Sequence, residues 1–147
     1  MTYQGIDIQH PKQRGEWAEL CFMKRAAEHG LCITKPYGEM AHYDFAVEYE
    51  GHFARVQVKS TKYKRHGTYV CNVLANNGPY GTNQIDFVAA YVIPLDLWYI
   101  IPVEAFQGQC HIHLSPHLKT SKFGPYQEAW TRLPHPPEKS QAASAGR

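Results

Sequence analysis

Two neighbouring segments in the middle of the chain alternate hydrophobic and polar residues. The segments YDFAVEYE and HFARVQVKS both repeat with the period of two that is typical of β-strands. Only Glu50 and Gly51 need to lie between them, which predicts a hairpin with a two-residue turn. In that register Phe45 faces Val56 on an apolar face. The other face is polar, and it includes three side chains of the segment ARVQVKS, namely Arg55, Gln57 and Lys59.

The remaining pattern predicts one long helix and several further strands. Residues 15–28, GEWAELCFMKRAAE, have a helical composition, and Gly30 is a suitable C-terminal stop. We expect strands in LCITKP, GTYVCNVL, IDFVAAYVI and DLWYIIP, a loop in ANNGPYGTNQ, and a short helix in PYQEAWTRL. One helix followed by several strands indicates an α/β or α+β sheet domain.

Composition limits the class of protein. The 147 residues, 44% of them hydrophobic, suit one globular domain at residues 1–133, whereas residues 134–147 lack an apolar anchor and predict a disordered tail. No apolar run approaches the roughly 20 residues of a membrane span, and the first residues lack a signal-peptide pattern. We therefore expect a cytoplasmic protein without a membrane partner. Its four scattered cysteines are expected to be free thiols.

Charge is informative only through its distribution. The formal net charge of +2 does not by itself imply a polyanionic partner. The segment KSTKYKRH nevertheless concentrates positive charge, and Lys62, Lys64 and Arg65 are candidates for contacts with DNA phosphates. The alternative is a solvated basic loop without a ligand.

The polar face of the hairpin gathers groups that suit metal-dependent hydrolysis. A two-residue turn places Asp44 opposite Gln57, with Lys59 on the same side. In the preceding helix Glu19 falls on the predicted buried side, and Glu16, about 60° away, is the competing choice. Carboxylate and amide oxygens suit Mg²⁺, for which Mn²⁺ is expected to substitute, and a lysine beside the ion can orient water or neutralise a phosphoryl transition state. The alternative is a structural Asp44–Lys59 salt bridge.

These residues resemble the PD-(D/E)xK nuclease superfamily. The motifs GEWAE, YD and QVK, with KPYG, IDFVAAY, WYIIP and YQEAW, are similar to small group I intron-encoded homing endonucleases and to archaeal Holliday junction resolvases. The resemblance implies a restriction-endonuclease-like αβββαβ core, in which helices flank a central mixed sheet. It also implies that Asp44 binds the metal, Gln57 replaces the second acid, Lys59 is the catalytic lysine and Glu19 is the helix acid. The carbonyl of Val58 is then a further metal ligand.

The expected function is a Mg²⁺-dependent endonuclease acting on double-stranded DNA, of homing or restriction-like type. The alternatives are a Holliday junction resolvase and an inactive DNA-binding relative, the latter because Gln57 adds no charge to the site. Cutting both strands with one site per chain implies a homo-oligomer, a dimer or tetramer.

Two weaker signals leave alternatives open. The segment CHIHLSPH, with Cys110, His111, His113 and His117, suggests zinc, although surface histidines explain it better. The loop NNGPYGTNQ either contacts DNA or is a plain turn.

Overall fold

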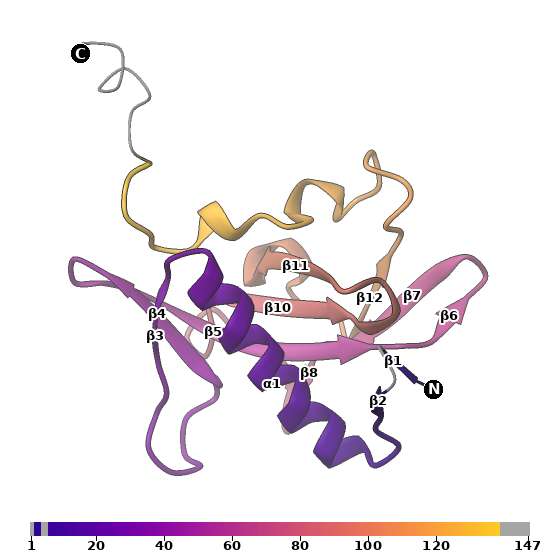
Figure 1. Ribbon diagram of the computed structural model, residues 1–147, viewed down its shortest axis with the longest axis horizontal. Helices are drawn as coiled ribbons and strands as arrows, with labels where there is room; N and C mark the ends of the chain where they lie inside the picture. Colours follow the sequence, from indigo (N-terminus) through magenta and orange to yellow (C-terminus); the bar gives the residue numbers. More distant parts are fainter. Residues whose placement is uncertain (1, 4–5, 139–147) are drawn as a thin grey trace.

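A five-stranded mixed sheet forms the centre of the molecule (Figure 1). The computed structural model describes residues 2–3 and 6–138, and side chains from residue 8 onward. The strand order is β11-β10-β5-β4-β3, with β10 parallel to β5 and the other neighbours antiparallel. The strands are β3 (Cys32–Thr34), β4 (Phe45–Tyr49), β5 (His52–Thr61), β10 (Phe87–Val92) and β11 (Leu97–Pro102). The predicted central mixed sheet is thus confirmed.

The hairpin of β4 and β5 has the register that the two-residue turn predicts. Phe45 pairs with Val56, and Tyr49 pairs with His52 at the turn. Glu50 has φ 47° and Gly51 has φ 81°, the left-handed conformations that a tight hairpin turn requires. The register therefore places Val56 in the apolar core and leaves Gln57 on the opposite face.

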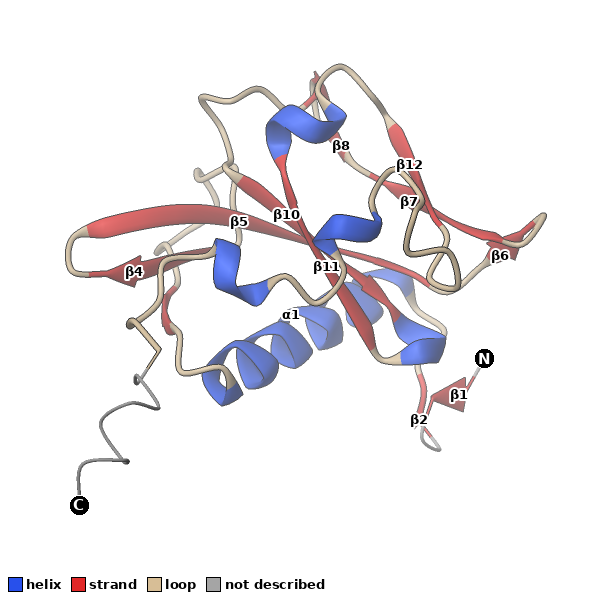
Figure 2. Ribbon diagram, turned by 90° about the horizontal axis from the view of Figure 1, so that it is seen from above, coloured by secondary structure: helices blue, strands red, loops and turns tan. Residues whose placement is uncertain are grey.

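Helix α1 (Pro11–Glu28) covers one face of the sheet (Figure 2). It begins four residues before the predicted Gly15, because the fixed φ of Pro11 suits the first helical turn and its missing N–H would have no helical acceptor there. It ends as predicted, since Gly30 has φ 75° and the N–H of Leu31 donates to the carbonyl of Ala26. The buried stripe of the helix includes Phe22, whose ring stacks 5.3 Å from that of Phe45.

The opposite face of the sheet packs against a second, three-stranded sheet. Its order is β12-β7-β6, formed by β6 (Lys64–Arg65), β7 (Thr68–Asn72) and β12 (His111–Leu114). Val88 and Ala90 of β10 belong to this second core, whereas Ala89 and Tyr91 face α1. Strand β10 is therefore buried on both faces, which explains its continuous apolar sequence.

Short elements complete the described chain. They are β1 (Thr2–Tyr3), β2 (Ile6–Asp7), β8 (Leu74–Ala75), β9 (Gly78–Pro79) and four 3-10 turns at Ile93–Leu95, Val103–Phe106, Gly124–Tyr126 and Trp130–Arg132. Within residues 6–138, α1 is the sole α-helix, and the connection from β5 to β10 contains β6 to β9. The order of α1, β3, β4, β5 and then β10 matches the predicted αβββαβ core. Strands β6 to β9 occupy the place of the second helix that this core was predicted to have.

The predicted short helix at residues 125–133 is wrong. Two 3-10 turns occupy this segment, and Glu128 between them has φ 50°, a left-handed conformation that interrupts a helix. The Glu128 carboxylate accepts hydrogen bonds from the backbone N–H of Trp98 at 3.0 Å and from the indole N–H of Trp130 at 2.6 Å. Tertiary hydrogen bonds thus determine the backbone here.

The tail prediction concerns residues 134–147, of which 139–147 lie outside the described residues. Pro134 and His135 are half-buried, and a ring nitrogen of His135 lies 2.8 Å from the carbonyl oxygen of Leu133. The boundary at residue 133 remains a prediction. No α-helix in the described part of the chain has the length and apolar character needed to cross a membrane. The four cysteines are free thiols.

Candidate active site

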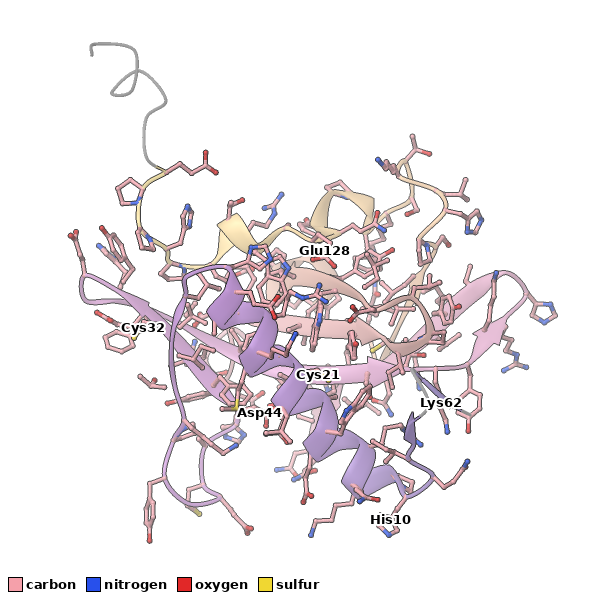
Figure 3. The ribbon with its side chains drawn as sticks, in the orientation of Figure 1. His10, Cys21, Cys32, Asp44, Lys62 and Glu128 are labelled. Carbon is pink, nitrogen blue, oxygen red and sulfur yellow. The ribbon has the colours of Figure 1, made fainter. Side chains whose placement is uncertain are left out.

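A cavity of about 350 Å³ opens where β4 begins and β5 continues beyond it. Asp44, Gln57 and Lys59 all line this cavity. Two segments, residues 39–42 of the loop before β4 and residues 74–77 of the β8–β9 hairpin, contribute to its walls together with Tyr80 and Gln84. The structure thus brings together the three candidate residues of the hairpin, and Figure 3 marks the position of Asp44.

Asp44 is held at the end of the hairpin by backbone hydrogen bonds. Its N–H donates to the carbonyl of Val56 at 2.9 Å, and its carboxylate accepts from the N–H of Val58 at 2.8 Å. Asp44 therefore lies just before the ladder that starts at Phe45, and it contacts the residues on both sides of Gln57.

The electrostatic surroundings of Asp44 disfavour its charged form. The pKa of Asp44 is raised to about 6. Burial is the main cause, and the nearby charge of Glu19 contributes to the same rise. The hydrogen bond from Val58 and the charges of Lys35 and Lys59 oppose this shift. A carboxylate that is short of positive charge in this way would be stabilised by a bound cation.

Lys59 is fixed by the loop that follows β7. Its ammonium donates to the carbonyl of Leu74 at 3.1 Å and lies 5.5 Å from the centre of the Tyr80 ring. Burial lowers the pKa of Lys59, while the charge of Asp44 works in the other direction. Lys59 thus projects into the cavity with a defined orientation.

The two candidate helix acids differ in their surroundings. Glu19 is half-buried, pairs with Lys35 at 3.2 Å and raises the pKa of Asp44 by its charge, whereas Glu16 is exposed. Helix α1 packs on the face of the sheet opposite Gln57 and Lys59, so Glu19 approaches Asp44 from the other side. The geometry favours Glu19 over Glu16.

The oxygen donors present suit a hard divalent cation. Asp44 supplies a carboxylate and Gln57 an amide oxygen at the cavity, whereas Glu19 does not line the cavity and acts on Asp44 through its charge. The N–H and C=O of a strand residue point to the same side, so the carbonyl of Val58 lies on the Asp44 side of β5. Among the described residues, no group of three or more His, Cys, Asp and Glu side chains is placed to hold a metal ion. A cation here would thus require the neutral oxygens as well as the carboxylate, and this set fits Mg²⁺.

Arg55 holds the loop of residues 82–86, next to the cavity residues Tyr80 and Gln84, against β5, a role that the sequence did not indicate. Its guanidinium donates to the Asp86 carboxylate at 3.0 and 3.1 Å and to the carbonyls of Thr82 and Asn83. It thereby fixes the loop that carries Tyr80 to the same strand as Gln57. The alternation of β5 placed Arg55 on the site face, but its partners are distant in the sequence.

Other site residues missed by the sequence reasoning come from loops. Tyr80 is buried, and burial raises its pKa to about 12. Asn76 and Asn77 of the predicted loop line the cavity, as does His42. The predicted loop thus forms part of the site wall, and its DNA contacts remain a prediction.

The basic hairpin, defined as Lys62, Lys64 and Arg65, lies apart from this cavity. It forms the β6–β7 end of the molecule (Figure 1), with Lys64 and Arg65 exposed. The ammonium of Lys62 lies 5.1 Å from the centre of the Tyr63 ring, which is itself 70% exposed. The hairpin therefore presents cations and an aromatic ring at the surface.

Among the described residues, the histidines of β12 belong to no group of three or more side chains that could hold a metal ion. His111 and His113 are exposed on one side of the strand, whereas Ile112 and Leu114 are buried on the other. Cys110 is exposed before the strand.

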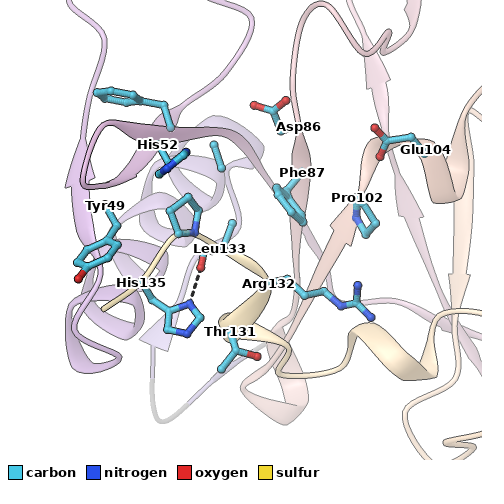
Figure 4. Close-up of a pocket in the computed structure, with 13 residues that line it drawn as sticks. Tyr49, His52, Asp86, Phe87, Pro102, Glu104, Thr131, Arg132, Leu133 and His135 are labelled. Atoms are coloured by element: carbon cyan, nitrogen blue, oxygen red, sulfur yellow. Dashed lines mark hydrogen bonds between the residues drawn. The ribbon is translucent and has the colours of Figure 1, made fainter. Parts of the chain in front are cut away.

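A larger cavity, of about 590 Å³, lies at the opposite end of β5 (Figure 4). His52, Phe87, Arg132 and His135 are among its lining residues, whereas Asp44, Gln57 and Lys59 are not. The candidate site residues therefore line the smaller of these two cavities.

The mixed sheet, the flanking helix and the cluster of Asp44, Gln57 and Lys59 define a nuclease of the PD-(D/E)xK class. The sequence signature of the PD-(D/E)XK endonuclease matches residues 9–132, so the chain belongs to this family. The chain is similar to the bacterial homing endonuclease I-Ssp6803I, with 34% sequence identity over 85% of this chain and 91% of that chain, and a TM-score of 0.70. No curated protein matches the chain. Membership makes the protein an endonuclease, implies DNA as its substrate, and confirms the resemblance; nucleases of this family generally use divalent metals.

Proposed function

We propose that the protein is a Mg²⁺-dependent endonuclease that cuts double-stranded DNA, of homing or restriction-like type. The observation that carries the proposal is that Asp44, Gln57 and Lys59 open into one cavity, with Asp44 oriented by the N–H of Val58. The similarity to a bacterial homing endonuclease supports the type.

In this proposal Asp44 is the principal ligand for the divalent cation. Gln57 and the carbonyl of Val58 add neutral oxygens, and Glu19 supplies the second negative charge. When bound, such a cation polarises a phosphoryl oxygen and neutralises developing negative charge. Mn²⁺, which shares these oxygen ligands, is expected to replace Mg²⁺.

Lys59 acts on the scissile phosphate and the attacking water. Its ammonium is anchored by the carbonyl of Leu74, so it offers its remaining N–H groups in fixed directions. These N–H groups can orient the attacking water and neutralise negative charge on the phosphoryl oxygens. The ammonium of Lys59 thus stabilises the negative charge that develops on the phosphoryl group in the transition state.

The basic hairpin supplies sequence-independent contacts with DNA phosphates. Cutting both strands requires two such cavities, so we propose a homo-oligomer, either a dimer or a tetramer. The free thiols support a reducing cytoplasm as the working compartment.

A Mg²⁺ titration of plasmid cleavage tests the assignments. Asp44→Ala and Lys59→Ala are expected to abolish cleavage, whereas Gln57→Ala should only raise the Mg²⁺ concentration needed for half activity, because one neutral oxygen is a smaller loss than a carboxylate. Circular dichroism checks that each variant is folded. Full activity of a folded Asp44→Ala protein would refute the mechanism.

The helix acid has a matched pair of variants. Glu19→Gln should reduce cleavage and raise the Mg²⁺ requirement, whereas Glu16→Gln, on the exposed side of the same helix, should leave both unchanged. The reverse result would assign the role to Glu16.

Two further assays test the alternatives. Preference for a four-way junction over a linear duplex would make the protein a junction resolvase. DNA binding without cleavage in Mg²⁺ or Mn²⁺ would instead indicate an inactive relative.

A further inference from the structure

The loop between β3 and β4, residues 35–43, exposes two large apolar side chains. Tyr37 is fully exposed and Met40 is 93% exposed. Single exposed apolar residues are common, but two on one loop beside a catalytic cavity indicate a contact with a partner. Figure 1 shows this loop extending away from the sheet, beyond the start of β4.

Both ends of the loop are fixed. At its start, the ammonium of Lys35 pairs with Glu19 at 3.2 Å and lies 4.9 Å from the centre of the Phe45 ring. At its end, Asp44 bonds to β5 through its N–H and its carboxylate. Gly38 has φ 82°, which allows the chain to turn at the tip. The exposed tip thus projects from a firmly held base.

The tip adjoins the reacting groups. Met40 lines the same cavity as Asp44 and Lys59, although most of its surface faces solvent. A duplex whose phosphate occupies this cavity therefore has Met40 beside it. This step depends on the proposed function, which places DNA in the cavity.

The chemistry of the tip does not suit phosphate binding. Residues 36–43, PYGEMAHY, contain no Lys or Arg, and Glu39 repels phosphates. Lys35 already pairs with Glu19. The apolar surface that DNA offers to such a tip is the face of its bases, and proteins use Met and other apolar side chains as wedges between base pairs.

We propose that Tyr37 and Met40 insert at a base step next to the scissile phosphate and unstack it. The insertion opens the duplex at that step and seats the phosphate in the cavity. Tyr37 and Met40 then act as positioning residues, because they contact bases and do not take part in the chemistry.

Base stacking reports the insertion directly. The Asp44→Asn variant keeps the DNA intact and serves as the background. Duplexes that carry 2-aminopurine at successive positions around the cut are bound to it, and the 2-aminopurine fluorescence should increase at one position. Adding Tyr37→Ala and Met40→Ala should abolish that signal. Leu118→Ala, which removes an exposed apolar side chain outside the loop, should leave it unchanged.

Cleavage provides a second readout. In the otherwise unaltered enzyme, the paired Tyr37→Ala and Met40→Ala changes should slow cleavage by about tenfold or more. A mismatch at the inserted step should restore the rate, because a mismatched base is already partly unstacked. Met40→Gln, which keeps the length of the side chain but not its apolar character, should also slow cleavage.

Three results would overturn the insertion. They are the absence of brightening at every step, brightening that survives the paired change, and equal slowing on matched and mismatched duplexes. If the loop instead docks a protein, the paired change will leave both DNA readouts unaltered. Failure of the proposed function is a separate outcome, seen as a protein with an intact loop that never cuts DNA in Mg²⁺.

Discussion

Asp44→Asn should stabilise the metal-free protein at neutral pH while it destroys activity. The folded state raises the pKa of Asp44 from 3.8 to about 6, a difference of about 2.2 pH units. At about 1.4 kcal/mol for each pH unit, ionising this side chain in the folded protein costs about 3 kcal/mol. Asparagine keeps an oxygen that accepts from the N–H of Val58 and carries no charge. The stability gain is therefore at most about 3 kcal/mol.

The sign of the pH dependence follows from the raised pKa. The folded state holds the Asp44 proton more tightly than the unfolded state, so the stabilisation from that proton is complete below about pH 4. It is lost as the pH rises to about 6 and is absent above that value. The difference between wild type and Asp44→Asn should accordingly be small at about pH 4 and complete at about pH 7.5.

Thermal unfolding in the presence of EDTA measures this difference. For a chain of this size each kcal/mol corresponds to roughly 2–4 °C, so Asp44→Asn should raise Tm at neutral pH by at most roughly 6–12 °C. Glu16→Gln removes an exposed carboxylate and should change Tm little. Added Mg²⁺ should raise the Tm of wild type but not that of Asp44→Asn. Equal Tm values at neutral pH, or a gain of the same size at about pH 4, would refute the reasoning.

The basic hairpin, the turn between β4 and β5, and the cysteines provide three further predictions. Replacing the three residues of the basic hairpin with alanine should weaken binding to all duplexes. It should also reduce the slope of log K against log salt by about 0.9 for each phosphate that the protein no longer neutralises. An unchanged slope would show that the hairpin does not touch DNA. Gly51→Ala should destabilise the protein by about 1–2 kcal/mol because Gly51 has φ 81°, whereas Gly15→Ala in α1 should stabilise it slightly, and chemical denaturation compares the two. A thiol reagent should modify the exposed Cys110 rapidly and Cys71 only on unfolding, because burial raises the pKa of Cys71 to about 12; rapid labelling of Cys71 in the folded protein would contradict its burial.

Local sequence was sufficient for the hairpin at the centre of the site. The alternation of β4 and β5 and the dipeptide Glu50-Gly51 predicted the register, because side chains alternate strictly along a strand and a two-residue turn allows one pairing. That register alone places Gln57 and Lys59 on one face. Proximity along the chain likewise brings Asp44 to the same edge, where the N–H of Val58 orients it.

The rest of the site depends on contacts between distant segments. The choice between Glu16 and Glu19 needed the packing of α1 on the sheet, since both acids lie on neighbouring arcs of one helix. The loop that carries Tyr80 needed Arg55 to meet Asp86, and outside the cavity the left-handed Glu128 needed the backbone N–H of the distant Trp98. Helical and strand periodicity express local steric preferences, whereas the partner of a buried charge depends on which elements the core brings together. Sequence alone therefore determined the strand that carries the candidate site and its register, and tertiary structure decided which aromatic ring and which loops line the cavity.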